Sequence, residues 1–211
     1  MKKVLILGAS GQIARWAIAA LAEKKGVAMT LLARNAKRLR ATPNNATVVE
    51  GDVLDERLLA RVVGGQDIVY ANLTGDDIDQ QAQAIIAAMN AAKVRRLVFV
   101  TSLGILDEVP GKFGTWNRRQ IGAYLPPFRR ASDAIEASGL DYTVLRPAWL
   151  TDVDEVDYET TEKGQPFKGT EVSRKSVAAL IAAIIDDPRQ HLNANVGVNK
   201  PGTDGDKPSF Y

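Results

Sequence analysis

The chain has 211 residues, no cysteine and a single histidine, His191. These counts exclude disulfides, thiolate catalysis and cysteine-ligated zinc sites, and they disfavour imidazole-based triads. Apolar residues make up 45% and charged residues 25% of the chain, and the formal net charge is +2, as in a soluble globular protein. No run of Lys and Arg suggests a nucleic-acid surface, and no apolar stretch approaches a membrane span. We therefore expect a cytoplasmic monomer or homodimer whose partner is a small molecule, with no nucleic-acid or membrane partner.

Short apolar runs alternate with segments of helical period, a pattern typical of parallel strands joined by crossover helices. The expected strands are Lys3–Leu7, Met29–Ala33, Thr47–Glu50, Asp67–Ala71, Arg96–Thr101, Tyr142–Leu145 and Val196–Val198. The expected helices are Gln12–Lys25, Glu56–Val63, Gln80–Ala92, Ser132–Ala137 and Lys175–Ile185. This order predicts an α/β protein with a doubly wound, mostly parallel sheet, the Rossmann fold, in a single domain over residues 1–211.

Two connections are longer than a crossover turn requires, about residues 104–128 and 149–169. Long connections in compact domains are often lids over a ligand, although ordered surface is an equal alternative. We expect small substrate-covering loops here. The acidic run between Asp152 and Glu159 has no histidine nearby, so we interpret it as solvated surface and expect no metal site.

The turn after the first strand carries Gly8, Gly11 and Ala14 and leads directly into an amphipathic helix. In this context Gly8 permits the tight turn, Gly11 lets the main chain approach a pyrophosphate, and Ala14 keeps the helix close to the sheet. Helix amides at the positive end of the helix dipole then face the phosphates. The expected pyrophosphate contacts are Gly8, Ser10, Gly11, Gln12 and Ile13.

The end of the second strand predicts which dinucleotide binds, because the residue there meets the adenosine ribose. No carboxylate follows this strand before Glu50; instead the chain has Arg34, Lys37 and Arg38. A guanidinium suits a 2′-phosphate, so we expect NADP (NADPH) as the cofactor, with Arg34 and Arg38 as contacts. The alternative is that these residues are simply solvated.

The third and fourth strands end in Asp52-Val53 and Ala71-Asn72, where the fold places the adenine. Asp52 can accept a hydrogen bond from the adenine amino group or cap the next turn, and both can hold. Val53 and Ala71 are expected to cover a ring face. All four residues are candidate cofactor contacts.

The fifth and sixth strands bring Thr101, Ser102 and Pro147 to the carboxyl edge of the sheet. We expect Thr101 and Pro147 near the nicotinamide and Ser102 to orient a substrate carbonyl, although Ser102 can also merely stabilise a turn. The aromatic residues Trp116, Tyr124, Phe128 and Trp149 form either a rim for a flat substrate or the core of their loops.

Together these segments resemble the atypical short-chain dehydrogenase/reductases known as NmrA-like or NAD(P)H-binding proteins, including the biliverdin-IXβ and flavin reductase type. The resemblance is carried by Gly8–Ala14, Ala33–Arg38, Gly51–Val53, Thr101-Ser102, Ser138–Thr143, Leu145–Pro147 and Val172–Ala178. It implies NADP(H) binding with Arg34 and Arg38 near the 2′-phosphate, and it implies substrate chemistry less firmly.

The chain departs from the wider superfamily because no tyrosine is followed four residues later by lysine. In Tyr-x-x-x-Lys the lysine lowers the pKa of the phenol so that it can donate a proton. The nearest substitute is Tyr124 with Arg129 or Arg130, but Pro126-Pro127 are expected to break the helix that sets the spacing.

Hydride transfer to a flavin, quinone or carbonyl needs little help from the protein. The sequence therefore favours an NADPH-dependent oxidoreductase acting on a small planar acceptor, with Ser102 and Tyr124 as the catalytic candidates. The alternative is a non-catalytic, NADP(H)-sensing regulatory protein. An epimerase or dehydratase is disfavoured because little chain remains for a substrate domain.

Overall fold

The computed structural model describes residues 1–211 and contains one eight-stranded sheet in the order β3-β2-β1-β4-β5-β6-β10-β8. The strands are β1 (Lys2–Leu7), β2 (Val27–Ala33), β3 (Ala46–Glu50), β4 (Ile68–Ala71), β5 (Arg96–Val100), β6 (Asp141–Pro147), β8 (Glu159–Thr161) and β10 (Ala194–Asn199). Every neighbouring pair is parallel except β10 and β8. The strand order reverses between β1 and β4, so the expected doubly wound, mostly parallel sheet is confirmed.

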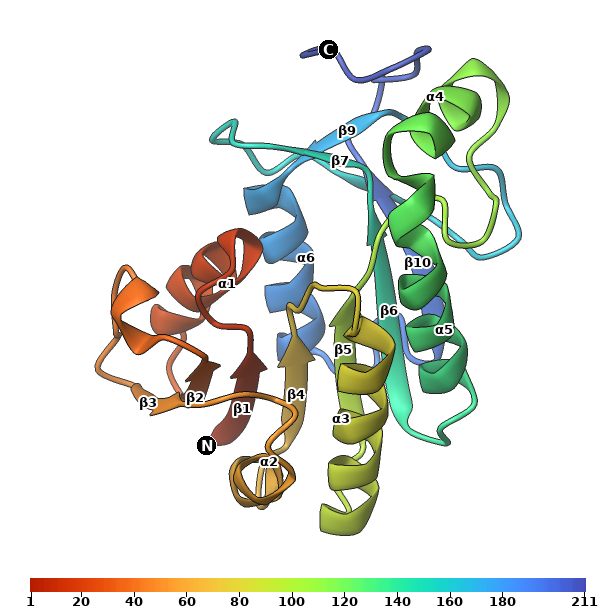
Figure 1. The fold of residues 1–211 in the computed structure, drawn as a ribbon. Helices are drawn as coiled ribbons and strands as arrows, with labels where there is room; N and C mark the ends of the chain where they lie inside the picture. The colour runs from red at the N-terminus through yellow and green to blue at the C-terminus, as the bar shows by residue number, and fades with distance from the viewer.

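Helices cover both faces of the sheet (Figure 1). They are α1 (Gln12–Ala22), α2 (Glu56–Val63), α3 (Ile78–Ala92), α4 (Gly111–Ile121), α5 (Leu125–Glu136) and α6 (Arg174–Asp186). One hydrophobic core contains the buried residues of α1 and α6, and a second contains those of α2, α3 and α5. The two cores explain why the central strands are apolar on both faces.

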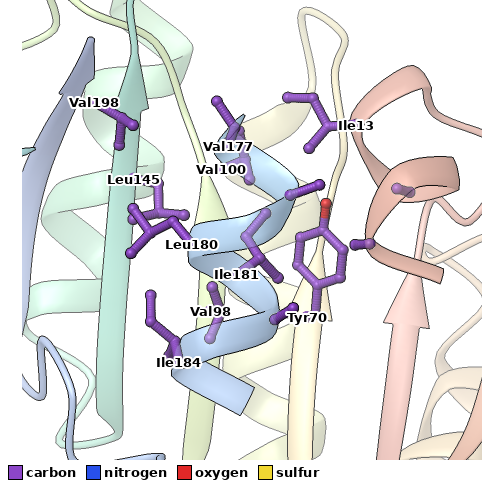
Figure 2. Packing of buried hydrophobic residues seen from close by; sticks show 14 of the residues in the cluster. Ile13, Tyr70, Val98, Val100, Leu145, Val177, Leu180, Ile181, Ile184 and Val198 are labelled. Carbon is purple, nitrogen blue, oxygen red and sulfur yellow. The ribbon is translucent and has the colours of Figure 1, made fainter. Parts of the chain in front are cut away.

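Helix α6 packs its apolar face over β4, β5 and β6, as Figure 2 shows. Leu180, Ile181 and Ile184 are fully buried there. Tyr70 of β4 lies in the same core with its side chain 0% exposed, and its hydroxyl has no hydrogen-bond partner in the structure. Burial also raises the pKa of this phenol far above its usual range.

The segment 104–128 is largely helical and is not the extended loop that the sequence predicts. It contains α4, a short 3₁₀ helix at Gly122–Tyr124 and the start of α5. Pro126 and Pro127 occupy the first turn of α5, so the expectation that they break this helix is wrong. The first turn has no intrahelical partners for its amides, and proline is therefore tolerated there.

The segment 149–169 also contains regular structure. Strand β7 (Trp149–Thr151) pairs in parallel with β9 (Glu171–Ser173) in a separate two-stranded sheet, and β8 joins the edge of the main sheet. Figure 1 shows β7 and β9 lying across the carboxyl end of the main sheet, close to the C-terminal segment. These connections therefore contain regular structure that lies across the carboxyl edge of the main sheet.

A buried ionic network joins the segment after β5 to the sheet. The Arg146 side chain is 0% exposed and pairs with Glu108, whose side chain is 5% exposed. Arg146 Nε donates to Asn195 Oδ1 at 2.8 Å, and Asn195 Nδ2 donates to Glu136 at 2.7 Å. Glu108 also accepts the amides of Gly104 at 3.0 Å and Leu106 at 2.9 Å. The network thus joins β6, β10, α5 and the segment that follows β5.

The unpaired hydroxyl of Tyr70 predicts that Tyr70→Phe stabilises the fold. The ring packing is kept while a desolvated donor is removed, so we expect the free energy of unfolding to rise by about 1 kcal/mol. Urea denaturation measures the change, with Tyr158→Phe as a control on a half-buried tyrosine. A loss of stability in Tyr70→Phe would show that the hydroxyl has a partner.

The buried pair predicts a large cost for Glu108→Gln, because the Arg146 guanidinium keeps its charge and loses its counter-ion. We expect a loss of roughly 3–5 kcal/mol in the free energy of unfolding. Asp206→Asn is the matched control, since its pair with Lys112 is exposed and is expected to contribute less than about 1 kcal/mol. Similar losses for the two variants would contradict the assignment.

Candidate functional site

A cavity of about 280 Å³ lies at the carboxyl ends of β1 to β4. It brings together nine of the expected cofactor contacts: Gly8, Ser10, Gly11, Gln12, Arg34, Arg38, Asp52, Val53 and Asn72. These residues follow the ends of four neighbouring strands, and the turns after β1 and β4 flank the point where the sheet topology reverses. Ligands bind at this point in open α/β sheets.

The glycine turn is shaped by Asn72 at the end of β4. Gly8 has φ +73°, and a Cβ on it would lie 2.2 Å from the Asn72 carbonyl oxygen. A Cβ on Gly11 would lie 2.0 Å from Asn72 Nδ2. Because neither glycine has a side chain, Asn72 at the end of β4 can pack directly against the glycine turn. This close approach within the protein requires glycine in addition to the expected approach of a pyrophosphate.

The start of α1 is open to an anion. Its N-cap is Gly11, no side chain caps it, and its first turn has no acidic residue. The first amides of a helix have no intrahelical acceptor and lie at the positive end of the dipole. A dinucleotide pyrophosphate fits these donors and the glycine cradle.

Arg34 and Arg38 line the cavity, are exposed and form no ion pair in the structure. The carboxylate of Glu50 accepts a hydrogen bond from the Ala36 amide, between the two arginines in the chain, at 2.8 Å. Glu50 does not line the cavity. Two unpaired cations and no carboxylate at this position suit a phosphate better than a ribose hydroxyl.

Asp52 both lines the cavity and stabilises a turn. Its Oδ1 accepts the Leu54 amide at 2.9 Å, whereas the N-cap of α2 is Asp55, which accepts the Leu58 amide at 3.0 Å. Asp52 therefore does not cap the helix itself. Because Asp52 also lines the cavity, it can stabilise its turn and still contact an adenine, as the sequence predicts.

Four expected cofactor contacts lie outside this cavity: Thr101 and Pro147 line a second cavity, and Ile13 and Ala71 are buried. The side chains of Ile13 and Ala71 are 5% and 0% exposed, belong to the two hydrophobic cores and do not line the cavity. Their side chains pack inside the protein instead of facing the cavity.

The sequence interpretation missed four lining residues that follow Asn72: Leu73, Thr74, Asp77 and Gln81. Gln81 Nε2 donates to Asp77 Oδ1 at 2.7 Å and to the Thr74 carbonyl at 3.3 Å, which fixes the loop between β4 and α3. The available sequence signal was the position of Gln81, four residues before Ile85 on the apolar face of the helix.

A second cavity, of about 400 Å³, contains Thr101, Ser102 and Pro147 beside apolar and aromatic side chains. The Thr101 hydroxyl donates to the Leu145 carbonyl at 2.9 Å, so Thr101 joins β5 to β6. Ser102 Oγ is half-buried and lies 3.2 Å from the Leu103 carbonyl, a local contact that a ligand can replace. Ser102 is therefore the better placed hydroxyl for a ligand.

A third cavity, of about 390 Å³, is lined by Ser102, Tyr124, Phe128 and Thr74. Ser102 also lines the second cavity, and Thr74 also lines the first. The three cavities are thus neighbours along one edge of the sheet. The two catalytic candidates, Ser102 and Tyr124, face the same space.

Neither Arg129 nor Arg130 takes the place of the lysine of Tyr-x-x-x-Lys beside Tyr124. Arg129 binds Asp133 at 2.9 Å, and Arg130 binds Asp79 at 2.7 Å, a hydrogen bond that lowers the pKa of that carboxyl. Both guanidinium groups are therefore engaged with carboxylates, and neither contacts the phenol. Tyr124 is 60% exposed at the mouth of its cavity.

The four aromatic candidates divide between two places. Tyr124 and Phe128 line the third cavity, while Trp149 lines the second and packs on Trp116 with ring centroids 4.9 Å apart. Tyr211 completes this ring cluster at 5.0 Å from Trp116 and was not expected there. The rings therefore act both as packing for their segments and as cavity wall.

The acidic run after β7 is paired with basic side chains. Asp152 contacts Arg174 at 3.2 Å, and Asp154 contacts Lys175 at 2.6 Å. No group of three or more His, Asp or Glu residues is arranged to hold a metal ion. None of the helices has the length and hydropathy needed to cross a membrane.

Solved structures of known proteins match this fold over its whole length. A Rossmann-fold NAD(P)-binding family protein from Shigella flexneri is 56% identical, with complete coverage of both chains and a TM-score of 0.87. A short-chain dehydrogenase/reductase from Veillonella parvula, crystallised in complex with NADP, is 29% identical over 99% of both chains with a TM-score of 0.89.

Two curated relatives are 25% identical to the chain. An uncharacterized sugar epimerase of Bacillus subtilis aligns over 198 residues, 88% of each chain. An NAD(P)H azoreductase of Xenophilus azovorans aligns over 152 residues, which are 70% of this chain and 48% of that protein. The chain thus spans about half of the azoreductase.

A family model described as NAD(P)H-binding matches residues 8–188, from the glycine turn through α6. Its match includes every residue that lines the first cavity. With the glycine cradle, the open helix start and the unpaired arginines already placed around that cavity, the chain belongs to the NAD(P)H-binding family.

Proposed function

We propose that the protein is an NADPH-dependent oxidoreductase that passes hydride to a small planar acceptor, a flavin, a quinone or a carbonyl compound. The observation that carries the proposal is the sharing of Thr74 and Ser102 among the three cavities, which supports a cofactor site beside two spaces that hydroxyl groups line. The azoreductase relative favours reduction of a flat acceptor.

The first cavity would hold the cofactor. The amides of α1 would bind the pyrophosphate, and Arg34 and Arg38 would bind the 2′-phosphate that distinguishes NADPH from NADH. The NADP complex of the Veillonella parvula relative supports this choice. When bound, NADPH supplies the hydride, so the chain need only position and protonate the acceptor.

In the remaining cavities Ser102 would donate a hydrogen bond to the acceptor and Tyr124 would supply a proton, as solvent also can. Ser102 lines both spaces, and the exposed position of Tyr124 gives its phenol access to water. Helix α4, the 3₁₀ turn before α5 and β7 would cover the acceptor in place of the expected loops.

Arg34→Ala tests the cofactor assignment. Loss of one charge-assisted contact to the 2′-phosphate is expected to weaken NADPH binding about tenfold or more and to leave NADH binding nearly unchanged. Isothermal titration of both dinucleotides measures the effect, with Arg57→Ala, an exposed arginine on α2 outside the cavity, as the matched control. Equal affinities of the wild type for NADPH and NADH would exclude the preference.

Ser102→Ala and Tyr124→Phe test the chemistry. We expect Ser102→Ala to lower kcat/KM for NADPH oxidation by roughly 10²-fold with a carbonyl acceptor and much less with a quinone or flavin. Tyr124→Phe is expected to have a smaller effect, because water reaches the same space. Stopped-flow absorbance of NADPH measures both.

If NADPH binds tightly but no flavin, quinone or carbonyl compound oxidises it, the oxidoreductase proposal fails. A protein with that behaviour would fit the alternative of an NADP(H)-sensing regulator, whose occupied and empty forms bind a partner differently.

A further inference from the structure

Three aromatic rings from distant parts of the chain meet beside the second cavity, and two of them, Trp149 and Tyr211, line it. Trp149 packs on Trp116 at 4.9 Å, and Tyr211 lies 5.0 Å from Trp116 and 5.2 Å from Trp149. Trp149 Nε1 donates to Asn117 Oδ1 at 2.9 Å, which fixes the orientation of its indole. The cluster is therefore a rigid apolar surface, of the kind that binds flat ligands.

The segment 208–211 is anchored although its rings remain partly open to solvent. Ser209 binds the Glu171 carboxylate through its amide at 2.6 Å and its hydroxyl at 2.8 Å. Phe210 and Tyr211 nevertheless are 50% and 54% exposed, and both line the second cavity. Their exposed apolar area is available to stabilise a bound ligand.

Arg174 is the single charged residue that lines this cavity. Its side chain is only 18% exposed. Its two contacts, with the Leu150 carbonyl at 3.4 Å and with Asp152 at 3.2 Å, both use Nη1. Nε and Nη2 make no hydrogen bond within the protein, so these donors are free to bind an anionic group that enters the cavity.

The carboxylate of Asp152 is a weak competitor for this guanidinium. Its side chain is 64% exposed, it is shared with Arg15 at 3.9 Å, and it does not line the cavity. Exposed ion pairs contribute little to stability. An acidic ligand group inside the cavity can thus add contacts at Nε and Nη2 without displacing Asp152.

We propose that the acceptor site takes a planar aromatic acid, with its ring system against Trp149, Phe210 and Tyr211 and its carboxylate or sulfonate on Arg174. This inference rests on the proposed function for the role of the ligand as acceptor. The binding step itself needs no hydride transfer, so it is tested separately.

The experiment compares 2-naphthoate with 2-naphthamide, its neutral analogue, by isothermal titration of the full chain without cofactor. One charge-assisted pair predicts that the wild type binds the acid about tenfold more tightly than the amide. Arg174→Gln is expected to weaken naphthoate about tenfold and to leave naphthamide within about twofold. Tyr211→Ala is expected to weaken both ligands.

Lys175→Gln is the matched control, because Lys175 is the neighbouring cation, pairs with Asp154 and does not line the cavity. It should leave both affinities unchanged. Equal affinities of the wild type for the two ligands, an Arg174→Gln variant that retains naphthoate binding, or no binding of either ligand would each overturn the proposal.

These outcomes are distinguishable from failure of the proposed function. Selective naphthoate binding without NADPH oxidation would support the acid site and contradict the oxidoreductase. NADPH oxidation without any preference for the acid would support the oxidoreductase and contradict the acid site.

Discussion

Burial of the Arg146 guanidinium constrains the whole ligand-binding edge. A charge with a fully buried side chain must be paired and hydrogen-bonded, and Glu108 meets this requirement only if the segment after β5 folds back over β6. The same carboxylate then holds the amide of Gly104, while Asn195 connects the guanidinium to α5. The pair thus holds the segment that leads into α4, whose residue Ile121 lines the second and third cavities.

The sheet and its flanking helices were predictable because their signal is local. Glu56–Val63 was predicted with its observed bounds, and the seven expected strands differ from prediction by at most two residues at either end. The short strands β7, β8 and β9 and the first seven residues of α5 were not predicted. Helix α4 was missed because Gly111 and Gly114 are poor helix formers and read as loop residues. Gly114 is required by its surroundings, since a Cβ there would lie 2.0 Å from the Val109 carbonyl oxygen.

The part of the candidate site that was predictable consists of turns and charged residues that directly follow the expected strands. The glycine turn, Arg34 and Asp52 all line the expected cavity. Phe210 and Tyr211 carry no comparable sequence signal, because only the tertiary fold brings them to Trp149. The pairing of Arg146 with Glu108 likewise has no local signal, because 38 residues separate the two in the chain.

The cofactor cavity and the aromatic second cavity are formed by different halves of the chain. Every residue of the cofactor cavity falls within residues 8–81, and every residue of the aromatic cavity falls within residues 100–211. The reversal of strand order between β1 and β4 places these halves at one edge, where Thr74 and Ser102 meet around the third cavity. None of the aromatic residues of the second cavity, nor Arg174, lines the cofactor cavity. Substitutions at these positions can therefore alter the second cavity while the glycine turn, Arg34 and Arg38 stay intact.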